Sequence, residues 1–205
     1  MFRKILSIDI GVHNLGLSYS LLGEDFTFER VVSIDLVDMT HFKHKKVPLE
    51  ECKLYHSKTF CDWTNHIIQE NKEMFDEAET ILIERQPPFS AFTAIEQLIF
   101  DKFRAKTHLI NPCSVHKHLS MRHLSYDLRK EKTVRITSQV LNEELLGQFE
   151  SYERKHDIGD SVAQMLYWSE IKNWEYRVKE RKRCSEYRDR DIFTYLESFR
   201  YIEKK

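Results

Sequence analysis

Four acidic residues, spread over three distant segments, have the types and spacing of a divalent-metal site. Asp9 lies in ILSIDIG and Glu84 ends TILIE, so each belongs to a short run rich in β-branched residues. Asp157 and Asp160 are three residues apart where a helical pattern begins, so both can point from one face. Four carboxylates in one pocket ionise fully only beside a cation, and hard oxygen ligands favour Mg²⁺, with Mn²⁺ as a substitute.

The elements that must position these residues follow from the hydrophobic periodicity. We expect strands at residues 4–10, 15–22, 26–37, 80–84 and 108–111, and helices at residues 57–76, 92–103, 131–146 and from near 157 past 174. The apolar stripe of the last helix includes Trp174. Three strands followed by alternating helices and strands are typical of an α/β domain, with a mixed five-stranded sheet flanked by helices on both faces. This is the ribonuclease H-like fold class.

Length and composition predict a single domain over residues 1–205, with residues 175–205 as a basic helical extension. The chain has 205 residues, of which 41% are hydrophobic, and nine glycines and prolines in all, too few for a flexible linker. The four cysteines, Cys52, Cys61, Cys113 and Cys184, show no CxxC spacing, which favours free thiols in a reducing compartment. No leader sequence and no membrane-spanning run is evident, so we expect a soluble intracellular protein.

The net charge of −1 conceals two basic clusters, at residues 129–132 and 179–184. Basic clusters near an acidic metal site suit a polyanionic substrate, although the second can equally be a solvated helical face. Residues 38–54 are polar and contain two histidines without matching ligands, so we expect a loop that binds no metal.

Four motifs together resemble those of the RuvC-like Holliday junction resolvases, and most closely the poxvirus-type resolvases of large DNA viruses. They are Ile8-Asp9-Ile10-Gly11 with Asn14, Ile83-Glu84-Arg85-Gln86-Pro87, Arg129-Lys130-Glu131-Lys132, and Asp157-Ile158-Gly159-Asp160-Ser161. The motifs occur in the order of that family and span nearly the whole chain.

The resemblance implies a Mg²⁺-dependent, structure-selective endonuclease. Such an enzyme resolves four-way junctions by paired symmetric nicks, in recombination, repair or the processing of viral concatemers. It implies two ions per site, held by Asp9, Glu84, Asp157 and Asp160 as catalytic ligands, and products with 5′-phosphate ends. It also implies a homodimer that binds branched DNA. A large-virus origin would place the enzyme at cytoplasmic replication sites or in the nucleus.

The resemblance further implies a catalytic lysine before the penultimate helix. We assign Lys132, while Lys117 and Lys130 stay open as alternatives. The expected DNA contacts are Arg85, Gln86, Phe89, Lys117, Arg129, Lys130, Lys182 and Arg183. An aromatic wedge at the junction centre is expected at Phe89 or Phe92, although Phe92 also fits the apolar stripe of its helix.

Three other functions use the same motifs. A nuclease that acts on RNA:DNA hybrids would share the four carboxylates, and a junction-binding protein that has lost its chemistry would share the fold. An actin-like or sugar-kinase-like phosphotransferase also begins with a strand that ends in Asp-x-Gly. However, the chain has five glycines and no glycine-rich phosphate loop after the first strand, which disfavours that third reading.

Overall fold

The computed structural model describes residues 2–11, 14–38 and 59–202, with side chains described as far as residue 183. Cys52 and nearly all of the polar segment at 38–54 lie outside the described residues, as does the Cys184 side chain. Cys61 and Cys113 are free and exposed, as predicted.

A five-stranded mixed sheet forms the centre of the domain. Its strands are β1 (Arg3–Ile10), β2 (Asn14–Leu22), β3 (Phe28–Asp38), β4 (Thr80–Glu84) and β5 (Thr107–Ile110), in the order β3-β2-β1-β4-β5. The first three strands pair antiparallel, whereas β4 and β5 run parallel to β1. The predicted fold class requires such a mixed sheet, in which the parallel strands return through helices.

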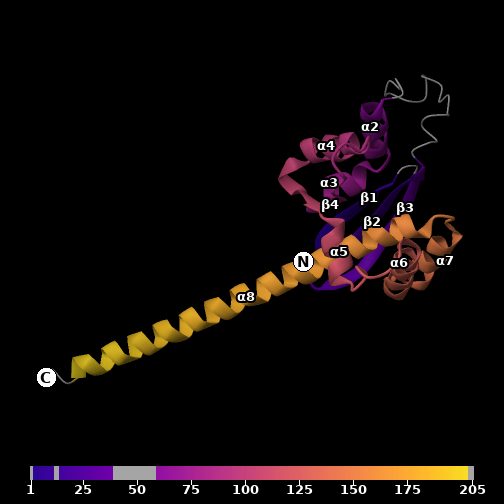
Figure 1. The fold of residues 1–205 in the computed structure, drawn as a ribbon. Helices are drawn as coiled ribbons and strands as arrows, with labels where there is room; N and C mark the ends of the chain where they lie inside the picture. Colours follow the sequence, from indigo (N-terminus) through magenta and orange to yellow (C-terminus); the bar gives the residue numbers. More distant parts are fainter. Residues whose placement is uncertain (1, 12–13, 39–58, 203–205) are drawn as a thin grey trace.

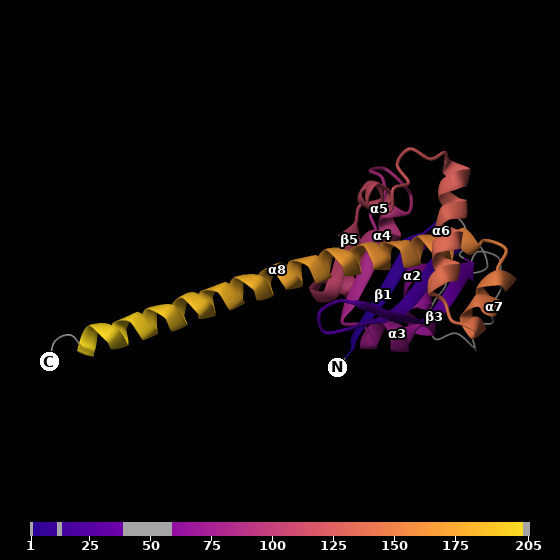
Figure 2. The same cartoon turned by 90° about the horizontal axis from the view of Figure 1, so that it is seen from below.

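Helices cover both faces of this sheet (Figures 1 and 2). One layer consists of α2 (Phe60–Glu70), α3 (Lys72–Glu77) and α4 (Thr93–Lys102). The other consists of α5 (Pro112–His118), α6 (Tyr126–Val140), α7 (Glu143–Ser151) and α8 (Lys155–Ile202). The long helix α8 crosses the sheet and then continues well beyond the domain.

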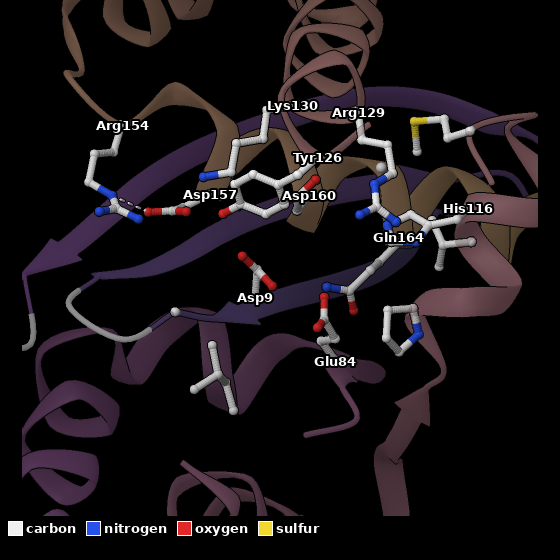
Figure 3. Close-up of a pocket in the computed structure, with 16 residues that line it drawn as sticks. Asp9, Glu84, His116, Tyr126, Arg129, Lys130, Arg154, Asp157, Asp160 and Gln164 are labelled. Atoms are coloured by element: carbon white, nitrogen blue, oxygen red, sulfur yellow. Dashed lines mark hydrogen bonds and ion pairs between the residues drawn. The ribbon is translucent and has the colours of Figure 1, made fainter. Parts of the chain in front are cut away.

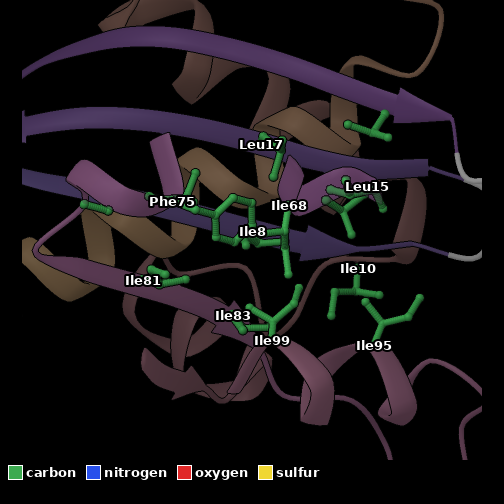
Figure 4. Close-up of a cluster of buried hydrophobic side chains, with 14 of the residues drawn as sticks. Ile8, Ile10, Leu15, Leu17, Ile68, Phe75, Ile81, Ile83, Ile95 and Ile99 are labelled. Carbon is green, nitrogen blue, oxygen red and sulfur yellow. The ribbon is translucent and has the colours of Figure 1, made fainter. Parts of the chain in front are cut away.

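The larger hydrophobic core lies between the sheet and α2, α3 and α4 (Figure 4). Ile8, Leu17 and Ile83 project from the strands toward Ile67 on α2 and Ile99 on α4, and all five are essentially buried. Because side chains alternate along a strand, the residues between them face the opposite layer. That alternation sends Asp9, the neighbour of Ile8, to the face that α8 covers.

The structure corrects several predicted helix boundaries. The helix expected at 57–76 is divided at Asn71 into α2 and α3, and the helix expected at 131–146 is divided into α6 and α7. Asn142 causes the second break, because its side chain accepts a hydrogen bond from the Leu145 N–H and caps α7. Ser125 caps α6 in the same way, so the basic cluster at 129–132 lies within a helix and not before it.

Trp174 is a further correction. Its side chain is 65% exposed on the outward face of α8, although the adjacent Asn173 side chain still donates to the Asp25 carbonyl at 2.8 Å. The helical character predicted for the tail is confirmed, since α8 extends to Ile202. Within the described residues, no helix combines the length and the apolar character needed to cross a membrane.

Candidate active site: an acidic pocket

The sheet places two of the predicted carboxylates side by side. Strands β1 and β4 are parallel neighbours with Ile8 opposite Ile83, so Asp9 and Glu84 are the next residues along the two strands. Both side chains therefore lie near the carboxyl ends of the strands, the edge where parallel sheets commonly bind ligands. Asp9 is buried and Glu84 is partly buried.

Helix α8 brings the other two carboxylates to the same edge. Asp157 is its third residue, which excludes the N-cap position that an aspartate often takes. The close approach of α8 depends on Gly16, which pairs with Asp9 across the sheet. A Cβ atom at Gly16 would lie 2.1 Å from the Asp157 carbonyl oxygen, so any side chain there would push the helix away.

Gly159 has a related role at a different contact. A Cβ at Gly159 would lie 3.2 Å from the backbone of Thr133 on α6. Gly159 therefore accommodates α6, and Gly16 accommodates the sheet. Gly11, at the rim of the pocket, donates its N–H to the Asn14 carbonyl at 2.9 Å, which links the end of β1 to the start of β2.

The four carboxylates line one pocket of about 280 Å³. Figure 3 shows Asp9 and Glu84 on one side and Asp157 and Asp160 on the other, all directed into the cavity. The remaining wall is basic and aromatic, with Tyr126, Arg129, Lys130, Arg154 and His116 among the lining residues. The structure thus brings together all four predicted metal ligands and two of the predicted basic residues.

Burial and repulsion between neighbouring charges raise the pKa of Asp9, Glu84 and Asp160. Burial, followed by the charge of Glu84, raises the pKa of Asp160 to about 7. Burial also raises the pKa of Asp9 well above its ordinary value, with further contributions from the other three carboxylates. The pKa of Glu84 is raised by burial, and a hydrogen bond from Asp9 opposes that rise. Raised pKa values in buried carboxyl groups mean that too little positive charge lies nearby to balance them.

Asp157 differs from the other three because basic side chains already contact it. The Arg154 Nε donates to its Oδ2 at 2.9 Å, and the His156 Nε2 lies 3.1 Å from its Oδ1. The same His156 nitrogen is 2.7 Å from the Lys130 Nζ. One ring nitrogen can donate to Asp157 or accept from Lys130 but cannot do both, so these two contacts compete.

The residues present fit a divalent cation by chemistry. Carboxylate oxygens are the ligands that Mg²⁺ and Mn²⁺ prefer, and the raised pKa values of Asp9 and Asp160 show that positive charge would stabilise the ionised pocket. Within the part of the chain that the structure describes, however, no three His, Cys, Asp or Glu side chains are already arranged around one ion.

The predicted lysines are separated by the structure. Lys130 lines the pocket, with its Nζ 4.3 Å from the centre of the Tyr126 ring. The Lys132 Nζ instead donates to the carbonyls of Leu119 and Ser120, at 2.7 and 3.3 Å, which directs it away from the carboxylates. Lys117 is exposed and does not line the pocket either. The geometry favours Lys130 over the assigned Lys132.

The loop after Glu84 presents the predicted aromatic residue. Phe89 is fully exposed and has a φ of 69°, a left-handed conformation that is uncommon for a bulky residue. Phe92 is partly buried against the core, with its ring 6.1 Å from that of Phe60. Arg85 is exposed, while the Gln86 backbone N–H donates to Glu96. Of the two candidates, Phe89 alone is accessible to a ligand.

The last two predicted DNA contacts are far from the pocket. Lys182 and Arg183 lie on the part of α8 beyond the domain, and Arg183 forms an ion pair with Glu180 at 3.0 Å. At about 1.5 Å per helical residue, Lys182 is roughly 33 Å along the axis from Asp160. These residues therefore cannot take part in the chemistry of the acidic pocket.

Sequence reasoning missed several lining residues that the structure places at the pocket, among them Tyr126, Arg154 and Gln164. The serine at 125 followed by Tyr126 was an available helix-start signal. For Arg154, the signal was its spacing of three residues from Asp157, at which opposite charges can pair around a helix start. Gln164 is buried and donates to the Ile8 carbonyl at 3.4 Å, a contact that no local pattern indicates.

Comparisons with known proteins agree with this architecture. The sequence profile of the family described as Poxvirus A22 protein matches residues 3–173. The fowlpox virus resolvase, solved in complex with substrate Holliday junction DNA, is 18% identical, with a TM-score of 0.60 over 82% of this chain and 97% of that chain. A structure of the fowlpox virus Holliday junction resolvase is 17% identical, with a TM-score of 0.58 over 82% of this chain and 99% of that chain. These likenesses confirm the predicted fold class. No curated protein sequence matches the chain significantly.

Proposed function

The chain belongs to the Poxvirus A22 protein family, which confirms the predicted resemblance, and from this premise we propose that it is a nuclease that resolves Holliday junctions. The observation that carries the proposal is the convergence of Asp9, Glu84, Asp157 and Asp160 in one pocket with a basic wall. The fold is shared with two resolvase structures, one of them bound to its junction substrate.

We propose that the reaction depends on Mg²⁺, with Mn²⁺ as a substitute, and that two ions are held by the four carboxylates. When bound, such ions lower the pKa of a water molecule and stabilise charge on the leaving oxygen. The raised pKa values of Asp9 and Asp160 support this proposal, because a cation is what would keep both groups ionised at neutral pH.

The basic wall of the pocket supplies the remaining functions. Lys130 and Arg129 lie where a phosphate that contacts the carboxylate-bound ions would need counter-charge, and we propose Lys130 as the cation that stabilises developing negative charge. Hydrolysis adds water across the phosphodiester, so the P–O3′ bond breaks and leaves a 5′-phosphate and a 3′-hydroxyl. The exposed Phe89 is proposed to stack in the opened junction centre, where unstacked bases offer a π-face.

Two further elements of the proposal follow from the substrate. A four-way junction is resolved by two symmetric nicks, which requires two active sites and therefore a homodimer. We also propose that Lys182 and Arg183 contact a DNA arm, since α8 carries them away from the catalytic domain. We propose that the enzyme acts in infected cells, at cytoplasmic replication sites or in the nucleus, which its membership of a poxvirus family supports.

The first experiment compares a labelled four-way junction, a matched linear duplex and an RNA:DNA hybrid, with Mg²⁺ or EDTA. We expect symmetric, Mg²⁺-dependent nicks in the junction, and Asp160→Asn should reduce their rate by at least about 10²-fold while junction binding persists. Cutting of the hybrid alone would support the hybrid nuclease instead. Binding without any cutting would support a junction-binding protein that has lost its chemistry.

A second experiment tests the extension. Replacing Lys182 and Arg183 with alanine removes two cations, so junction binding should weaken and the slope of log affinity against log salt should fall by up to about two. Arg135→Ala, on the outer surface of α6, controls for loss of positive charge elsewhere. Unchanged binding and slope would mean that the extension does not contact DNA.

A further inference from the structure

The contacts of Asp157 conflict with its proposed role as a metal ligand. Its side chain is 7% exposed, Arg154 Nε donates to Oδ2 at 2.9 Å, and His156 Nε2 lies 3.1 Å from Oδ1. Both carboxylate oxygens therefore already face a basic side chain. Asp9, Glu84 and Asp160 have no ion pair in the described part of the chain, so this compensation is specific to Asp157.

Of the two basic groups, Arg154 is the one placed to leave. Its side chain is 40% exposed at the rim of the pocket, and Figure 3 shows it approaching Asp157 from outside the cavity. Its only other polar side-chain contact among the described residues is a long one, 3.5 Å from NH2 to His156 Nε2. His156, in contrast, is flanked by Lys130 as well as by Asp157.

The position of Arg154 along the chain is not one that favours the helix. Arg154 immediately precedes α8, where the helix dipole is positive and a cationic side chain is destabilising. Asp157, in the first turn, already provides the favourable negative charge. The arginine is therefore better explained by its contact with the carboxylate than by helix stability.

We propose that Arg154 is an exchangeable counter-ion that occupies Asp157 until a divalent cation binds and then moves to a DNA phosphate. This inference rests on the proposed nuclease function, since it takes the acidic pocket as the metal site. The guanidinium remains charged in both positions, and its planar fork of N–H donors matches a phosphate as well as a carboxylate. A bound cation then frees Arg154 for a phosphate, and a bound phosphate draws Arg154 away from Asp157, so each binding event favours the other.

Such an exchange makes the two binding events cooperative. If a cation releases Arg154 toward DNA, then DNA must draw Arg154 from Asp157 and raise the affinity for the cation by the same factor. A chain without DNA would hold its ions weakly, and a chain on its substrate would hold them tightly. Arg154 is in this sense a positioning residue that acts through Asp157.

The first test measures Mn²⁺ binding to the full chain without DNA, by electron paramagnetic resonance of the free ion. Arg154→Gln should tighten Mn²⁺ binding by about tenfold, because the ion no longer displaces a charged hydrogen bond from Asp157. Arg104→Gln is the matched control: Arg104 forms an ion pair with Asp101 at the same three-residue spacing, but on the exposed surface outside the pocket. It should leave Mn²⁺ affinity unchanged.

Two other variants keep the test decisive. Arg154→Lys retains the charge but loses the fork, so its Mn²⁺ affinity should lie between those of the wild type and Arg154→Gln. Glu84→Gln should weaken Mn²⁺ binding if the pocket is the metal site. If Glu84→Gln has no effect, the proposed function fails along with this inference. If Glu84→Gln weakens binding but Arg154→Gln does not tighten it, only the exchange is wrong.

The second test measures the coupling itself, through junction affinity in EDTA and in Ca²⁺, with the junction confirmed intact on the same gel. The wild type should bind the junction more tightly in Ca²⁺ than in EDTA, and Arg154→Gln should lose about tenfold of that gain, equal to its change in metal affinity. An equal gain from Ca²⁺ in both proteins would overturn the proposal, because Arg154 would then contribute nothing to the coupling.

Discussion

The two faces of the sheet are built differently, although the same strands form both. On the face that α2, α3 and α4 cover, Ile8, Leu17 and Ile83 interlock with helix side chains in a continuous apolar core. On the face that α8 covers, the same strands present Asp9, Gly16 and a run of serines. The hydroxyls of Ser7, Ser18 and Ser20 are buried without a hydrogen-bond partner among the described residues.

This difference shows what each face contributes. Large apolar side chains on the first face bury area in the larger core. The second face also holds apolar clusters, which include Leu22, Val162 and Phe149, but small residues lie beside the pocket. Small residues on the second face contribute little of that kind, but they let α8 approach until the Asp157 carbonyl would touch a Cβ at Gly16. The catalytic geometry is thus obtained by removing side-chain volume, at a cost in unpaired polar groups.

The sharpest test of this comparison is a truncation on the apolar face. Ile67→Ala, on α2, should lower the free energy of unfolding by about 2–5 kcal/mol, because it leaves a cavity in a fully packed core. Urea unfolding measures this loss, and Mn²⁺ affinity below the transition should be unchanged because the pocket is on the other face. Altered metal binding would contradict the separation of the two faces.

On the catalytic face, Gly16→Ala should reduce stability less than Ile67→Ala does, but it should reduce junction cleavage more. The new Cβ displaces the start of α8, which we expect to lower the free energy of unfolding by about 1–3 kcal/mol and to abolish most junction cleavage. Gly147→Ala is the control, since nothing lies within 4 Å of a Cβ there and alanine should stabilise α7 by up to about 1 kcal/mol. Full activity in Gly16→Ala would show that α8 need not approach so closely.

The carboxylates also predict a pH dependence for the metal-free protein. Because the pKa of Asp160 rises to about 7 on folding, from 3.8 in the unfolded chain, the folded state holds a proton that the unfolded state releases between these values. The contribution to stability is full below about pH 4 and is lost as pH rises through about 7. Asp160→Asn should make this decline smaller, leaving the part that the raised pKa values of Asp9 and Glu84 cause, and urea unfolding in EDTA from pH 5 to 8 would measure the difference. If the free energy of unfolding changed with pH equally in the wild type and in Asp160→Asn, Asp160 would not be a cause of the decline.

The smallest expected effect belongs to the unpaired hydroxyls. Ser18→Ala removes a fully buried hydroxyl that has no partner among the described residues, so stability should stay within about 1 kcal/mol of the wild type or increase. Calorimetric unfolding checks this, with Ser161→Ala as the control, because the Ser161 hydroxyl donates to the Ile158 carbonyl at 2.8 Å. A large loss for Ser18→Ala would reveal a partner that the hydroxyl holds in solution.

The sequence alone predicted the elements that carry chemistry better than those that connect them. Asp9 and Glu84 follow strong strand patterns, and Asp157 and Asp160 open a long helical one, so local periodicity was enough to place all four. The break before α7 was missed because the apolar positions on both sides keep helical spacing, and only the cap at Asn142 marks the division.

Other features were not accessible to pattern reasoning. Trp174 continues the helical stripe, but which residues of the stripe face the domain depends on the rotation of α8 against it. The choice between Lys130 and Lys132 depends on the rotation of α6 about its axis, which the contact of Gly159 with Thr133 determines. The three-residue spacing of Arg154 and Asp157 allowed a pair, but whether the two side chains meet depends on the turn that precedes α8.

Helix α8 is one continuous rod that carries catalytic residues near one end and the extension at the other, so the two parts are mechanically connected. From Asp160 to Ile202 the rod measures roughly 60 Å, at about 1.5 Å per residue. It packs against the sheet at Gly16 and against α6 at Gly159, close to its first turns, and the Asn173 side chain further along donates to the Asp25 carbonyl at 2.8 Å. A tilt of about one degree there would swing the far tip by about 1 Å over that length. The tilt of α8 affects how far Asp157 and Asp160 lie from Asp9 and Glu84 on the sheet. A partner that binds the far end of α8 would therefore restrain these separations.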